Sequence, residues 1–122
     1  MRTMYGKYKE YHTSLDNRSV VSGKSMAESV QVYLDIIDNI ETNGTYVNKN
    51  PFGEPQLGKR GIYPTLGSAK EENLAVDKLL WLLAYSDGTC DVIDIANKLN
   101  LPAKELKNEI DQLVKAGLLE EV

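Results

Sequence analysis

The chain has 122 residues, of which 14 are Lys or Arg and 18 are Asp or Glu, so its formal net charge is −4. This acidic balance argues against a general binder of nucleic acid or of anionic membranes. The content of 42% hydrophobic and 26% charged residues allows a packed core and excludes wholesale disorder. One histidine and one cysteine exclude an internal disulfide, and they exclude a zinc or thiol active site built from this chain's soft ligands alone.

The start of the sequence lacks the apolar core of a signal peptide, and no apolar run reaches the length that crosses a membrane. Together with the single cysteine, this predicts a cytoplasmic protein with no membrane partner. Residues 1–70 hold nine Lys/Arg against seven Asp/Glu, a balance of +2, whereas residues 71–122 hold five against eleven, a balance of −6. Because this shift coincides with a Gly/Pro-rich stretch, we expect a boundary near residues 66–68, which gives domains 1–67 and 68–122.

The first expected helix covers residues 25–43, and the segment before it lacks periodicity and is expected to be loop. Ser25 and Glu28 match a capping box, in which a hydroxyl and a carboxylate satisfy the first backbone N–H groups of a helix. Val32 and Ile36 lie off the main apolar stripe, so we expect burial on more than one side, against the C-terminal module or a second copy. The stripe itself has helical spacing and consists of Met26, Val30, Tyr33, Leu34, Ile37 and Ile40.

Residues 46–67 contain three of the four prolines and four of the nine glycines. A flexible linker and an ordered loop are both consistent with this composition. We favour the ordered loop, because flexible linkers seldom carry several large apolar residues together. In this stretch they are Phe52, Leu57, Ile62, Tyr63 and Leu66.

Residues 70–122 are expected to form three helices and a terminal strand. The first helix is strongly apolar, the second is short with Thr89 as its N-cap, and the third begins near Pro102, which suits a first helical turn. A short helix, a tight turn and a longer helix form the helix-turn-helix pattern. The closing LVKAGLLEEV resembles the third helix and first wing strand of winged-helix domains. The partner strand of the wing is then either missing or supplied from elsewhere, with Tyr46 and Val47 as candidates.

The predicted fold is therefore mainly α with minor β (α+β): one amphipathic helix and an ordered loop, followed by a three-helix winged-helix-like module. Its last helix offers Lys104, Lys107 and Asn108 as candidate DNA contacts. The module nevertheless has a charge of −6 and no arginine, although neutralisation of phosphates supplies most non-specific affinity for DNA. We favour a module for packing or protein contacts; the alternative is a stand-alone winged-helix DNA-binding regulator.

The only histidine, His12, lies in the sequence YHTSLDN. Asp16, or a hydroxyl of Thr13 or Ser14, can hold one nitrogen of the imidazole and leave the other for a metal. A structural or surface histidine beside tyrosines is the competing interpretation. The spacing alone does not decide between them.

YHTSLDN resembles the last ligand loop of the zinc-dependent aminopeptidases. In the order of its segments, nearly the whole chain resembles the C-terminal part of bacterial aminopeptidase-like proteins linked with polysaccharide biosynthesis, which end in a winged helix. The resemblance implies an α/β zinc-peptidase domain followed by a small helical domain. It implies that His12 is a zinc ligand and that Asp16 is the acidic residue that supports it. In the segment GEPQLGKRGIYP, the residues implied to line or buttress the site are Glu54, Gln56, Arg60 and Tyr63.

The other metal ligands and the catalytic carboxylate of such a site are not in this sequence. We therefore expect a C-terminal fragment of a hydrolase-like protein that is not catalytic on its own, with Met1 as an internal start. Zinc is expected in the full-length parent and no cofactor in this chain alone. The expected partners are the missing upstream catalytic domain or a second copy, as in a homodimer, and nucleic acid is not expected.

Overall fold

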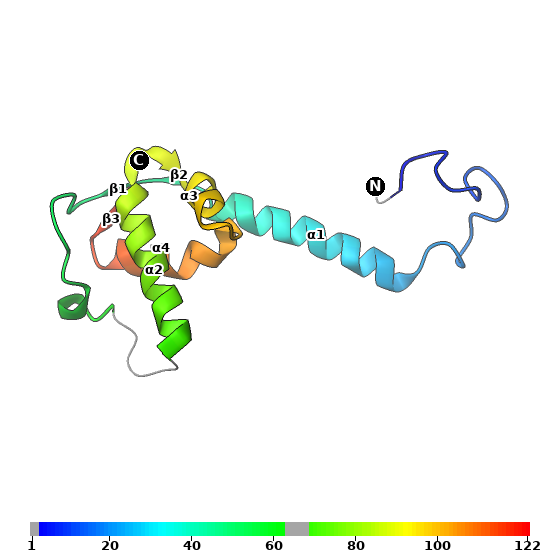
Figure 1. Ribbon diagram of the computed structural model, residues 1–122. Coiled ribbons are helices and arrows are strands. Elements are labelled where there is room, and N and C mark those ends of the chain that lie inside the picture. Colours follow the sequence, from blue (N-terminus) through cyan, green and yellow to red (C-terminus); the bar gives the residue numbers. More distant parts are fainter. Residues whose placement is uncertain (1–2, 63–68) are drawn as a thin grey trace. The chain divides into compact units, whose positions relative to one another are not determined.

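The computed structural model describes residues 3–62 and 69–122, with residues 69–73 as backbone only. It divides into two compact units, which meet in sequence between Asp38 and Asn39. The described residues form four α-helices, two short 3₁₀ helices and one three-stranded sheet, which confirms the α+β prediction (Figure 1). In chain order the elements are α1 (Gly23–Thr42), β1 (Thr45–Asn48), η1 (Leu57–Arg60), α2 (Ala69–Tyr85), β2 (Asp87–Asp91), α3 (Val92–Leu99), η2 (Ala103–Leu106), α4 (Lys107–Lys115) and β3 (Leu119–Glu121).

Helix α1 begins two residues earlier than the sequence predicts. The Ser22 hydroxyl accepts a hydrogen bond from the Ser25 N–H at 3.1 Å, and the Ser25 hydroxyl accepts one from the Ser22 N–H at 3.3 Å. This reciprocal pair is a capping box, with Ser22 at the cap and Ser25 in the third helical position. The prediction of Ser25 as the cap was therefore wrong, because the true cap lies one turn upstream.

The apolar side chains of α1 are all exposed, each with 47–60% of its surface accessible. They include the main stripe and the two residues that lie off it, Val32 and Ile36. The predicted docking of this helix on another surface therefore stays a prediction.

The core of the C-terminal unit lies between α2, α3, η2 and α4 on one side and the sheet and the Pro/Gly-rich loop on the other. Leu57 of that loop is 0% exposed and Ile62 is 8% exposed, and both belong to the core cluster. The prediction of an ordered loop is confirmed for its described part. Further core residues are Leu79, Leu82, Leu83, Val92, Ile95, Leu106, Ile110, Leu113, Leu118 and Leu119.

The boundary expected at residues 66–68 lies outside the described residues. Strand β1 and the described loop that follows it belong to the C-terminal unit, whose first residue is Asn39. The last turn of α1 joins this unit through hydrogen bonds: the Asn39 side chain accepts from the Lys104 N–H at 3.2 Å. Asn43 accepts from the Ile93 N–H at 3.0 Å. The end of α1 is thus fastened to both helices of the helix-turn-helix.

The sheet has the strand order β2-β1-β3, with both pairs antiparallel. Tyr46 lies opposite Glu121 and Val47 lies opposite Glu120, which confirms Tyr46 and Val47 as the partner strand of β3. Burial, with the nearby carboxylates of Glu121 and Asp111, raises the pKa of the Tyr46 hydroxyl. The central strand of the sheet, β1, therefore precedes the three helices in the sequence. In a wing hairpin, the strand that pairs with β3 would instead follow the helices.

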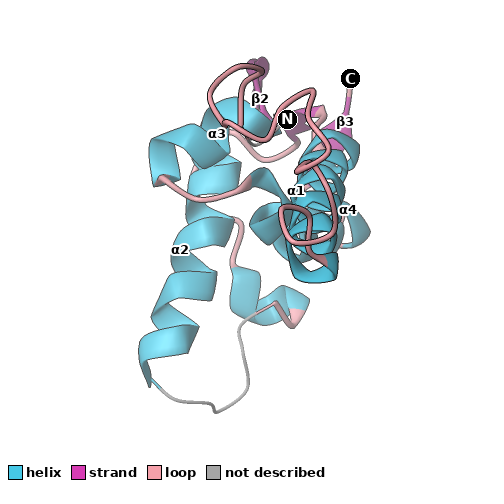
Figure 2. Ribbon diagram, turned by 90° about the vertical axis from the view of Figure 1, so that its right-hand side faces the viewer, coloured by secondary structure: helices cyan, strands magenta, loops and turns pink. Residues whose placement is uncertain are grey.

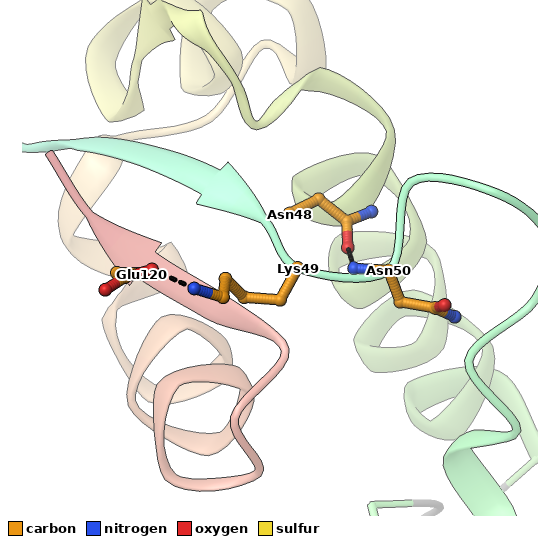
Figure 3. Close-up of polar contacts among 4 residues, drawn as sticks. All are labelled: Asn48, Lys49, Asn50 and Glu120. Carbon is orange, nitrogen blue, oxygen red and sulfur yellow. Dashed lines mark hydrogen bonds and ion pairs between the residues drawn. The ribbon is translucent and has the colours of Figure 1, made fainter.

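Asn48 closes β1 and bonds to three neighbours, of which Figure 3 shows Asn50. Its N–H donates to the Ser86 carbonyl at 2.7 Å, and its side-chain amide donates to the Leu83 carbonyl at 2.9 Å. Its side-chain oxygen accepts from the Asn50 N–H at 2.8 Å, an Asx turn that ends the strand. The ion pair between Lys49 and Glu120 ties the same end of β1 to β3.

Residues 87–91 form strand β2, and Asp91 rather than Thr89 caps α3. The Asp91 carboxylate accepts from the Asp94 N–H at 2.8 Å and from the Asn43 side chain at 3.1 Å. The Thr89 hydroxyl instead donates to Asp87 at 2.6 Å, a bond that lowers the pKa of the Asp87 carboxyl. The prediction of Thr89 as the cap was wrong because the strand continues for two residues beyond it.

Replacing Asp91 with Ala is expected to lower the free energy of unfolding at neutral pH by about 1 kcal/mol. The Asp94 N–H and the Asn43 amide lower the pKa of Asp91 in the folded protein. The part of the stabilisation that depends on the Asp91 charge is therefore fully present above the ordinary carboxyl pKa of about 3.9. It is lost as the pH falls through the lower pKa of Asp91 in the folded protein. Denaturant unfolding of wild type, Asp91→Ala and Asp91→Asn at neutral and acidic pH checks this. Asp91→Asn keeps a capping side chain and should lose this pH dependence.

Candidate functional site

The only histidine lies in a series of hydrogen-bonded turns, residues 3–22, before α1. His12 is exposed and has a left-handed backbone with φ of 58°. Its imidazole stacks on the Tyr11 ring, with centroids 4.2 Å apart and an interplanar angle of 22°. Tyr11 in turn contacts the rings of Tyr5 and Tyr8 at 5.1 and 5.7 Å. Ring stacking therefore positions the imidazole of this exposed residue.

The polar residues after His12 bond to the backbone. The Thr13 hydroxyl donates to the Glu10 carbonyl at 2.7 Å and accepts from the Leu15 N–H at 3.2 Å. No hydrogen bond joins His12 to Asp16 in the described part of the chain. Asp16 instead lines a small apolar cleft of about 230 Å³ with Tyr8. Partial removal from water, followed by the negative charge of Asp16, raises the pKa of the Tyr8 hydroxyl.

A metal site needs more than this loop provides. Within residues 3–62 and 69–122, no three His, Cys, Asp or Glu side chains gather closely enough to hold a metal ion. An exposed imidazole, which would bind a metal through a nitrogen in the plane of its ring, fits the role of a single ligand. The remaining ligands of such a site would have to come from outside the described residues.

Three of the four residues expected to line the site lie together in the C-terminal unit. Glu54, Gln56 and Arg60 surround an open cleft of about 330 Å³, with Asn50 and Lys59 beside them. The fourth, Tyr63, lies outside the described residues, and His12 and Asp16 belong to the other unit.

Arg60 buttresses this cleft. Its guanidinium donates to the Pro55 carbonyl and to the Ala116 carbonyl, each at 3.1 Å. The second bond ties the loop to the end of α4. Gln56 has a left-handed backbone, φ 53°, and precedes η1, which turns Leu57 into the core.

The helix of the module that could read DNA consists of η2 and α4. Lys107 forms an ion pair with Asp111 at 3.8 Å, and both side chains are more than 60% exposed. Asn108 is exposed, whereas Lys104 is half-buried and its N–H bonds to Asn39. Residues 103–115 hold three lysines and three carboxylates, Glu105, Glu109 and Asp111, of which Glu109 is buried. The segment therefore carries no net charge.

The comparisons with known proteins identify the family. The model of the winged helix-turn-helix family matches residues 44–121. The chain belongs to the winged helix-turn-helix family. The matched residues include β1 and the whole Pro/Gly-rich loop. This agrees with the packing, because Leu57 and Ile62 of that loop belong to the core of the C-terminal unit. A second model, described as a domain of unknown function (DUF4910), matches residues 1–43.

Two relatives match almost the whole of this chain, including the part before its winged helix-turn-helix unit. One is a Clostridium acetobutylicum protein whose name reads polysaccharide biosynthesis protein with aminopeptidase-like domain; it is 40% identical over 98% of this chain. The other is the crystal structure of a protein from Clostridium acetobutylicum named as a peptidase, with 38% identity, a TM-score of 0.82 and all of this chain covered. The chain spans 27% of the first and 26% of the second. The resemblance to aminopeptidase-like proteins that carry a winged helix is thereby confirmed.

One surface of the winged helix-turn-helix unit was not expected from the sequence. Trp81 on α2 is 42% exposed and stacks on Tyr85, with centroids 5.3 Å apart and an angle of 4° between the rings. The Lys98 ammonium lies over the Tyr85 ring, 5.1 Å from its centroid. The strongly apolar sequence of α2 could not show which side of the helix is left open. No helix in the described ranges is both long and apolar enough to cross a membrane.

Proposed function

We propose that this chain is the non-catalytic C-terminal region of a longer aminopeptidase-like protein, and that its winged helix-turn-helix unit serves packing or protein contacts. The two relatives support the first part, because one aligns with 98% and the other with all of this chain, in each case over only about a quarter of the relative's own length. Their names suggest that the longer protein is a hydrolase linked with polysaccharide biosynthesis. The single cysteine, Cys90, is a half-buried free thiol and is consistent with a cytoplasmic location.

The observation that carries a protein-contact role for the chain as a whole is the apolar surface of α1, which precedes the winged helix-turn-helix unit. Eight large apolar side chains on this one helix are each about half exposed, and proteins that act alone rarely present such a surface. Five of the eight follow a 4-3-4-3 spacing, from Met26 to Ile40, which gives a continuous seam. The positions beside the seam include Leu34 and Ile36 instead of the charged residues of a two-stranded coiled coil. So wide an apolar face suits burial in a larger domain better than a simple helix pair.

DNA binding is the alternative function, and an anisotropy titration of a labelled duplex at about 50 mM salt separates the two. We expect a dissociation constant weaker than about 10⁻⁴ M, the weak end of non-specific binding, because α4 carries no net charge. Lys104→Ala and Lys107→Ala should change nothing, as should the control Lys59→Ala in the loop. Tight binding that falls with salt and weakens in the two helix variants alone would establish the regulator instead.

We also propose that His12 donates one ligand to a zinc site completed by the rest of the longer protein. Zinc bound there would activate a water molecule for hydrolysis. The exposed imidazole supports this role, and its stack on Tyr11 would fix the direction of the ring.

The expected result is at least tenfold weaker zinc affinity for His12→Ala in the longer protein, measured by competition with a chelating dye. The 122-residue chain should bind zinc weakly with or without this substitution. Asp16→Asn is the comparison for the supporting role and should weaken affinity less than His12→Ala. Tight stoichiometric zinc binding by the chain alone, lost in His12→Ala, would contradict the proposal.

A further inference from the structure

The outward side of α2 carries an apolar patch that lies outside the core of the C-terminal unit, although one of its residues, Tyr85, also packs against that core. Figure 2 shows α2 at one side of this unit, with α3 beside its upper end. Leu74 is 57% exposed, Leu80 is 43% exposed and Trp81 is 42% exposed. Ala84 is exposed and Tyr85 is half-buried beside them. At 3.6 residues per turn these five positions fall on one side of the helix, opposite the buried Leu79, Leu82 and Leu83.

Two opposite charges flank the aromatic centre of this patch. Asp77 is exposed on the same side of α2, one turn before Trp81. Lys98 of α3 lies over the Tyr85 ring, one turn after Trp81. The patch is therefore negative toward the start of α2, aromatic in the middle and positive toward its end.

This order makes the patch complementary to itself. When two copies of α2 cross antiparallel at Trp81, residue 77 of one copy faces residue 85 of the other. Asp77 of each copy would then approach the Lys98 that covers Tyr85 in the other copy. The two Trp81 rings would meet on the symmetry axis, as an isologous contact requires. A parallel arrangement would instead bring like charges together.

We propose that the outward side of α2 is the interface of a symmetric homodimer, with Trp81 at its centre and two Asp77–Lys98 contacts at its edges. Tryptophan and tyrosine are the residues that most often carry binding energy at such centres. The patch is smaller than a standard interface, so the dimer is weak, with a dissociation constant between about 1 μM and 1 mM. The inference rests on the proposed protein-contact role. The two proposals can be contradicted separately. DNA binding by the chain would contradict the protein-contact role, whereas a monomeric chain would contradict only the α2 interface.

The chain contains a single tryptophan, so its intrinsic fluorescence reports on this interface directly. Sedimentation equilibrium of the 122-residue chain is expected to show a monomer–dimer equilibrium. With rising concentration, Trp81 emission should shift to shorter wavelength and its quenching by acrylamide should fall, with the same midpoint as the dimerisation.

Asp77→Lys and Lys98→Glu each place like charges at both edges and should weaken the dimer about tenfold or more. The double variant Asp77→Lys/Lys98→Glu restores opposite charges and should recover most of the affinity. Both substitutions are at exposed positions, so all three variants should retain the fold, which circular dichroism checks. Trp81→Ala should weaken the dimer at least tenfold, whereas Phe52→Ala, which removes a 93% exposed aromatic ring outside the patch, should not.

A chain that stays monomeric up to about 1 mM would overturn the proposal. So would a double variant no stronger than the two single variants, because charge complementarity would then play no part. A dimer that withstands Trp81→Ala and Asp77→Lys but is lost in Val30→Ser would place the contact on α1 and overturn it as well.

Discussion

Replacing Leu57 with Ala is expected to lower the free energy of unfolding of the C-terminal unit by about 2–5 kcal/mol. Leu57 is 0% exposed although it lies in a Pro/Gly-rich stretch, and it belongs to the same core cluster as the helices that follow. Truncation to Ala removes buried apolar surface and leaves a cavity that neighbouring side chains fill only in part. Since a domain of this size is stable by about 5–15 kcal/mol, the loss is a large fraction of the total.

Denaturant unfolding followed by Trp81 fluorescence measures this effect, because the only tryptophan lies in α2 of the same unit. The matched control is Phe52→Ala, five residues earlier in the same loop, where the ring is 93% exposed. That substitution should change the free energy of unfolding by no more than about 0.5 kcal/mol. A Leu57→Ala variant as stable as the control would mean that the loop is not part of the core.

The helical part of the fold was predictable because its apolar residues repeat at helical spacing. The partner strand of β3 was also predictable, since an unpaired final strand needs hydrogen bonds and Tyr46-Val47 was the available strand-forming sequence. Strand β2 was not predictable from Asp87-Gly88-Thr89-Cys90-Asp91, which has few strand-forming residues. It forms because β1 offers it a partner, so tertiary context overrides local propensity there.

The candidate site was likewise predictable from the sequence in one part and not in another. Glu54, Gln56 and Arg60 are close in sequence, and the turn at η1 brings them around one cleft. His12 has a left-handed backbone, which is uncommon for residues other than glycine, so the sequence did not indicate the turn in which His12 stacks on Tyr11. The open side of α2 was missed for another reason. Its apolar residues surround the helix, so periodicity does not distinguish a face that packs in the core from a face left for a partner.

Replacing Asn48 with Pro is expected to cost about 3 kcal/mol or more, because it acts on the central strand of the sheet. Proline has no N–H, so the 2.7 Å bond to the Ser86 carbonyl is lost, and Ser86 is only 3% exposed. The substitution also removes the side-chain amide that bonds to the Leu83 carbonyl at 2.9 Å. Each buried carbonyl left without its donor costs about 1–3 kcal/mol.

Asn48→Ala separates the two contributions. It keeps the backbone N–H and loses only the side-chain bonds, so its cost should be about 1–2 kcal/mol. Both variants are compared with wild type by denaturant unfolding and by hydrogen exchange at Leu119 and Val92, whose strand and helix depend on β1. The Val92 N–H donates to the Gly44 carbonyl at 3.0 Å, so it should exchange faster in Asn48→Pro if β1 is displaced. Equal stability of the Pro and Ala variants would show that the Asn48 N–H and its bond to the Ser86 carbonyl contribute little to the stability of the sheet.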